Sequence, residues 1–110
     1  MIDLVRDILD VAEKYGLRIL NIDATDVTLM ARLEILPTIN IQIYQNLRKE
    51  KLNLALIFGN TRIYGIDKEG RFYHQHPVED PESHVIVEEG LKVEDFVVEC
   101  LNILKEREIL

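Results

Sequence analysis

The three histidines of this 110-residue chain all lie within one short segment of the sequence. His74 and His76 are separated by one residue, and His84 follows after a stretch rich in proline and acidic residues. In an extended strand, side chains two positions apart point to the same face. Two imidazoles on one face could exchange protons near neutral pH or bind a metal ion together. The segment from residue 64 to residue 84 is therefore the predicted location of any functional site.

Two kinds of site would use these histidines. In the first, His74 and His76 transfer protons in a metal-independent ribonuclease, while Arg62 or Arg71 supplies the cation that holds the phosphate. In the second, His84 completes a three-histidine site that binds a metal ion and leaves a fourth position for water. A third interpretation is purely structural, because histidines at a strand end can also form ordinary local hydrogen bonds.

Other chemistry has little support in the residues. The single cysteine, Cys100, cannot form an internal disulfide, and its place on the apolar stripe of a predicted helix indicates a small core residue. There is no Gly-rich phosphate loop, no paired-cysteine motif and no serine nucleophile elbow. We therefore expect no cofactor.

The composition narrows the class of protein. With 47% hydrophobic and 30% charged residues, the chain should fold as a single domain over residues 1–110. A net charge of −7 argues against a dominant basic face for nucleic acid, although a local basic patch would still be compatible with it. No apolar run approaches the roughly 20 residues that a membrane helix needs, and no secretion leader is visible. We expect a cytoplasmic protein, and its Ile- and Leu-rich, Trp-free composition is typical of heat-adapted proteins.

The periodicity of the apolar residues predicts the elements that position the histidines. Three- and four-residue spacing predicts helices over residues 2–15 and 93–107. Alternation with a period of two predicts the strands between them, and residues 67–70 read as a tight turn. The predicted strands cover residues 17–23, 27–35, 39–44, 52–58, 61–66 and 71–75, with a further short piece at 85–87. The fold class is α+β: an N-terminal helix, an antiparallel meander of about five or six strands and a C-terminal helix, with both helices on one sheet face.

The sheet face opposite the helices is predicted to be more apolar than a solvated face requires. If the strands keep strict register, this face carries a set of apolar residues among polar ones, namely Met30, Leu36, Tyr44, Ala55, Ile57 and Ile63. We therefore expect self-association, most simply as a two-fold homodimer.

Residues 61–104 resemble the C-terminal half of the TumE-like small toxins and related uncharacterised domains of bacteria and archaea. The resemblance consists of an Asp-x-x-Gly sequence at residues 67–70, a strand running into His-x-His-Pro at residues 74–77, a loop to His84, and a helix beginning Val-Glu-Asp-Phe at residue 93. It implies a toxin that acts on RNA, with an antitoxin protein as partner. It also implies that His74, His76, His84 and Arg71 form the site, although no Asp follows Tyr73 as the family pattern would have it.

The sequence therefore leads to a small toxin-like, metal-independent ribonuclease, or an inactive relative of one, as the first hypothesis. The competing class is a non-enzymatic protein-interaction domain, in which the polar sheet face or the Ile-rich strands bind a partner. A small His-ligated metal protein is the third.

Overall fold

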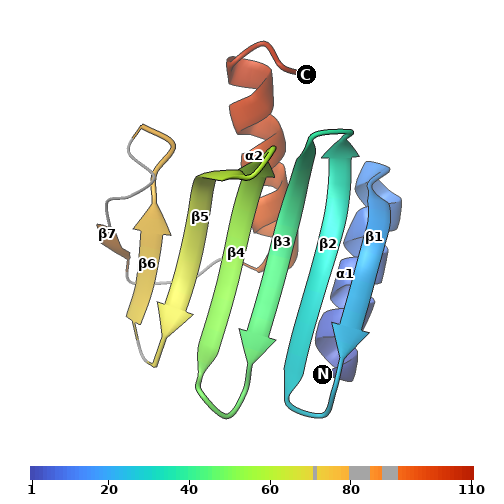
Figure 1. The fold of residues 1–110 in the computed structure, drawn as a ribbon, viewed down its shortest axis with the longest axis vertical. Coiled ribbons are helices and arrows are strands. Elements are labelled where there is room, and N and C mark those ends of the chain that lie inside the picture. Colours follow the sequence, from blue (N-terminus) through green and yellow to red (C-terminus); the bar gives the residue numbers. More distant parts are fainter. Residues whose placement is uncertain (71, 80–84, 88–91) are drawn as a thin grey trace.

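The computed structural model describes residues 1–70, 72–79, 85–87 and 92–110 (Figure 1). Its elements, in chain order, are α1 (Ile2–Tyr15), β1 (Arg18–Ala24), β2 (Thr28–Leu36), β3 (Ile39–Asn46), β4 (Lys51–Phe58), β5 (Thr61–Glu69), β6 (Phe72–His76), β7 (Val85–Val87) and α2 (Val93–Glu106). Within this part of the chain the strands form one sheet in sequence order, with every neighbouring pair antiparallel. The predicted α+β meander is confirmed.

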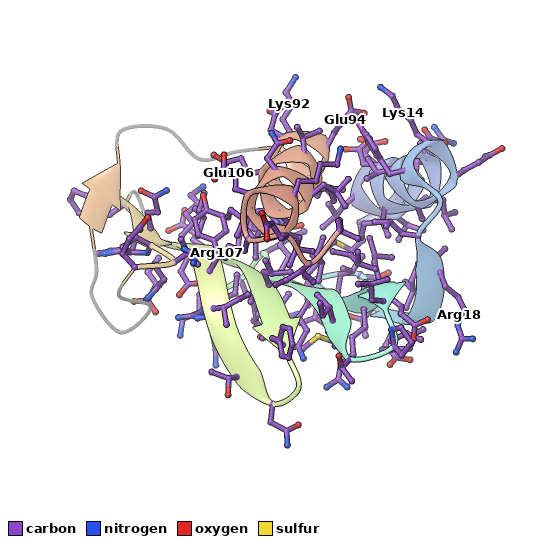
Figure 2. The ribbon with its side chains drawn as sticks, turned by 90° about the horizontal axis from the view of Figure 1, so that it is seen from above. Lys14, Arg18, Lys92, Glu94, Glu106 and Arg107 are labelled. Carbon is purple, nitrogen blue, oxygen red and sulfur yellow. The ribbon has the colours of Figure 1, made fainter. Side chains whose placement is uncertain are left out.

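Both helices cover the same face of the sheet (Figures 1 and 2). Helix α1 lies against the β1–β2 side and α2 against the central strands, whereas β6 and β7 extend beyond the helix layer. The two helices are joined by an exposed ion pair, in which the Lys14 Nζ lies 3.1 Å from a carboxylate oxygen of Glu94. Gly16 ends α1 in the left-handed conformation, with φ of 68°, as its position after the apolar stripe predicted. Among the described helices, none is long and apolar enough to cross a membrane.

The core lies between the helices and the inward face of the central strands. On the strands, the alternating apolar residues are buried, among them Leu33, Ile41 and Leu56, each with no exposed surface. On α2 the stripe that includes Phe96 and Cys100 is likewise fully buried. Burying a Leu, Ile or Phe side chain stabilises the fold by roughly 1.5–3 kcal/mol. This layer therefore fixes the register and decides which residues point to the other face.

Two irregularities move residues away from the helix-free face, which is the sheet face opposite the helices. The pairing of β2 with β3 shifts between Glu34 and Leu36, and that of β4 with β5 shifts between Leu56 and Ile57. As a result, Leu36 and Ile63 pack against the core, and the prediction that they lie on the helix-free face is wrong. A bulge inserts one residue and reverses the alternation beyond it, which strict register cannot anticipate.

Strand β5 is longer than predicted. It continues through Glu69 because β4 offers paired positions to its end: Asn53 lies opposite Asp67, and Lys51 lies opposite Glu69. The expected tight turn over residues 67–70 is therefore wrong, and only Gly70 has the left-handed φ of 60° that marks a turn. The extension places Asp67 inside a strand, on a face of the sheet.

Candidate functional site

His74 and His76 lie on the helix-free face, on strand β6. Their cross-strand neighbours on β5 are Asp67 and Gly65 respectively. The residue between them, Gln75, points the other way and hydrogen-bonds to Tyr64 on the helix side of the sheet. The prediction that the two histidines share a face is confirmed.

A chain of three polar side chains includes one of these histidines. The His76 Nε2 lies 2.8 Å from the Asp67 Oδ2, within hydrogen-bond distance. The Arg62 Nη1 donates to both oxygens of the same carboxylate at 3.3 Å. Asp67 thus bridges a guanidinium and an imidazole, and the three side chains hold one another in position.

His76 is 2% exposed, although α1 and α2 both lie on the other face of the sheet. Its neighbour Gly65 has no side chain, and a Cβ there would lie 2.9 Å from the Leu54 carbonyl oxygen and 3.2 Å from the Arg62 Cδ. The glycine therefore keeps the space that the Arg62 side chain occupies as it reaches Asp67. A buried imidazole bonded to a carboxylate is suited to positioning its neighbours and not to contacting a substrate.

His74 is more accessible than His76. It is half-buried, directly opposite Asp67, and its neighbour along the same face of β6 is Phe72, whose side chain is 59% exposed. An accessible imidazole beside an exposed aromatic ring could transfer a proton while the ring stacks on a base. The accessible part of the site therefore consists of His74, Phe72 and the exposed portion of Arg62.

The other predicted site residues, Arg71 and His84, lie outside the described residues, so their place near His74 stays a prediction. Among the residues that the structure describes, no group of three or more His, Cys, Asp or Glu side chains is arranged to hold a metal ion. A site that includes His84 is not tested by that finding.

Sequence reasoning missed the residue that organises this cluster. The succession Asp, Lys, Glu and Gly predicts a turn at Asp67, because these are typical turn residues. A better signal was available in the alternation itself. Gly65 and Asp67 continue the two-residue spacing of the strand, and the matching positions on β4 are also extended. This alternation predicts that the strand continues past residue 66 and that Asp67 lies on the same face as Gly65.

A second polar cluster lies on the helix side of the same strands. The Tyr64 hydroxyl donates to the Glu99 carboxylate at 2.8 Å and accepts from the Gln75 amide at 3.1 Å. Its ring stacks on Phe96 with centroids 5.6 Å apart, and burial raises the pKa of the phenol. The cluster borders a cavity of about 360 Å³ between α2 and the β6 end of the sheet. These bonds anchor α2 to β5 and β6.

Comparison of the chain with protein-family models, with curated proteins and with solved structures found no match of any of the three kinds. The resemblance to the TumE-like toxins therefore stays a prediction.

Proposed function

We propose that this chain is a small, metal-independent ribonuclease of the toxin type, with its site on the helix-free face where β5 meets β6. The observation that supports this proposal is the cluster of Arg62, Asp67, His74 and His76 on one face of two neighbouring strands. An imidazole that takes a proton and a guanidinium that binds the phosphate are groups that can cleave a phosphodiester through its 2′-hydroxyl.

The role of each residue in the proposed reaction follows from how exposed its side chain is. His74 is the less buried of the two imidazoles, and because its Nδ1 is buried, its Nε2 takes the proton of the RNA 2′-hydroxyl as that oxygen attacks the phosphorus. The P–O bond to the 5′-oxygen breaks, and the leaving oxygen takes a proton from solvent. Arg62 uses one terminal nitrogen for Asp67, and its side chain is 32% exposed, so the other N–H groups of the guanidinium can bind a phosphate oxygen. His76 and Asp67 hold that guanidinium in place and do not touch the substrate. His76 is thus a positioning residue in this proposal, whereas the sequence alone suggested a catalytic one.

The net charge of the chain affects how it would bind RNA. A net charge of −7 repels the RNA backbone at long range, so attraction has to come from the few cations near the site. We expect weak RNA binding with a shallow salt dependence, because few cations contact the phosphates. A partner antitoxin, which the resemblance implies, would block the same face.

The test compares growth inhibition and RNA cleavage by the wild-type protein with the same activities of His74→Ala. The control is Asn21→Ala, which changes a polar residue of β1, far from β6 on the same sheet. We expect His74→Ala to lose activity by about 100-fold or more and Asn21→Ala to keep it, with no effect of a chelator in either case. Full activity in His74→Ala, no activity in the wild-type protein, or loss of activity with a chelator would refute the proposal.

A specific observation also favours the second class, a protein-interaction domain. On the helix-free face, Met30 pairs with Tyr44, and Ala55 lies beside Gly65. Ala55 is only 7% exposed, and Met30, Tyr44 and Ile57 are half-buried. These residues were predicted for this face and do lie there. If the chain is a protein-interaction domain and not an enzyme, His74→Ala should change neither growth inhibition nor RNA cleavage.

A further inference from the structure

The centre of the helix-free face is nearly free of charge. The positions that β3 and β4 contribute to it are Asn40, Gln42, Tyr44, Asn46, Asn53, Ala55 and Ile57, with Lys51 at one end. In a chain with 30% charged residues, eight positions would carry two or three charges on average, whereas these positions carry one. The uncharged residues of this set, from Asn40 to Ile57, are called the central stripe below.

The charged residues of this face lie at its margins and balance one another. Two ion pairs join neighbouring strands, Arg18–Glu34 at 3.8 Å and Lys51–Glu69 at 3.9 Å, and a third, Arg62–Asp67 at 3.3 Å, lies within β5. Arg32 and Asp23 add one charge of each sign. On the described strands, therefore, the face carries no net charge, and the excess of −7 belongs to the rest of the molecule.

An uncharged centre within a charged rim is the arrangement found in protein interfaces. Tyr and Met are enriched in such centres, and here Tyr44 lies in the stripe beside Met30.

We propose that the central stripe is a two-fold interface between two copies of this chain. The charge balance selects this occupant. Two copies that meet through any other surface bring together the parts that hold the excess negative charge, whereas two helix-free faces meet without repulsion and with both signs available at the rim. In a two-fold dimer each residue near the axis also lies close to its own copy, so one substitution acts twice. The proposal does not depend on ribonuclease activity.

The experiment measures the mass of the protein in solution over a series of concentrations, by light scattering and by sedimentation. Gln42→Glu introduces a negative charge into the middle of the stripe of both copies. The matched control, Asn60→Asp, adds the same charge in the exposed turn between β4 and β5. Circular dichroism and a urea titration of each variant establish that it remains folded.

We expect the wild-type protein to have twice the 12.8 kDa mass of one chain. The dissociation constant should rise by at least tenfold in Gln42→Glu and stay unchanged in Asn60→Asp. If Gln42→Glu proves unfolded, Gln42→Lys replaces it, with the same expectation. A wild-type monomer at every concentration, or a dimer that tolerates charge in the stripe as well as it tolerates Asn60→Asp, would overturn the proposal. Neither result bears on the effect of His74→Ala on RNA cleavage.

Discussion

The substitution Asp67→Asn should destabilise the fold markedly, because Asp67 is the centre of the Arg62–Asp67–His76 chain. Its side chain is 18% exposed, and its two partners are 2% exposed for His76 and 32% for Arg62. Asparagine has nearly the same shape, but its amide presents donors where the carboxylate presented acceptors. With the amide oxygen toward His76, the Arg62 guanidinium faces another donor; with the amide nitrogen toward His76, the imidazole has to change to the tautomer whose Nε2 accepts.

The expected loss in the free energy of unfolding follows from how deeply the two partners of Asp67 are buried. A hydrogen bond to a charged group contributes roughly 1.5–3 kcal/mol, and leaving a buried partner unsatisfied costs about 1–3 kcal/mol. The hydrogen bond between Asp67 and His76 is buried, so it contributes at full strength. Solvent weakens the bond between Asp67 and Arg62, because Arg62 is more exposed. We expect a loss of about 2 kcal/mol in the free energy of unfolding, which corresponds to a fall in melting temperature of about 8–16 °C for a domain of this size.

The assay is urea unfolding followed by circular dichroism, with the slope against urea checked for constancy. Glu69→Gln is the matched control, because it removes the same charge from the same strand. Its partner Lys51 lies 3.9 Å away, and the two side chains are 66% and 41% exposed. An exposed pair of this kind contributes about 0–1 kcal/mol.

The double variant of Asp67→Asn with His76→Gln completes the test. If the two residues stabilise each other, their effects should fall short of additivity by at least about 0.5 kcal/mol. Equal stability losses in Asp67→Asn and Glu69→Gln would refute the reasoning, since they would mean that the buried chain contributes no more than a surface ion pair.

Three further predictions follow from single residues. Gly65→Ala should lower stability by about 1–3 kcal/mol in urea, because its Cβ would lie 2.9 Å from the Leu54 carbonyl oxygen; an unchanged midpoint would contradict this. Burial raises the pKa of the Tyr64 hydroxyl, so its contribution is complete below the ordinary value near 10 and is lost as pH rises above it. Urea midpoints measured from pH 9 to 11 should therefore fall more steeply for the wild type than for Tyr64→Phe, and parallel curves would argue against the assignment. Burial also raises the pKa of the Cys100 thiol, which has no exposed surface, so a thiol reagent should react only at the rate of global unfolding; rapid labelling of the native protein would show otherwise.

The helices and most strands were predictable because their signals are local. The alternation of Ile39, Ile41 and Ile43 marks a strand with one buried face, and the structure buries all three. The stripe that contains Phe96 and Cys100 likewise marks a helix with one buried side. These patterns work because burial of apolar surface dominates the energetics of each element and requires no knowledge of its partner.

The candidate site was predictable only in part. Spacing placed His74 and His76 on one face, and the structure agrees. The length of β5, however, depends on pairing with β4, which overrides the turn preference of residues 67–70. Without that pairing Asp67 would not reach His76, and no pattern within either strand reveals the contact.

The sequence by itself thus determined the element types, the two-sided character of the sheet and the shared face of two histidines, since each depends on the period of the chain alone. Only the tertiary structure decided that His76 is buried and bonded to Asp67 while His74 stays accessible. It also decided that bulges carry Leu36 and Ile63 to the core. The reason is physical: exposure, bulges and cross-strand bonds depend on which strands lie side by side, and register between strands is set by the packing of the whole core.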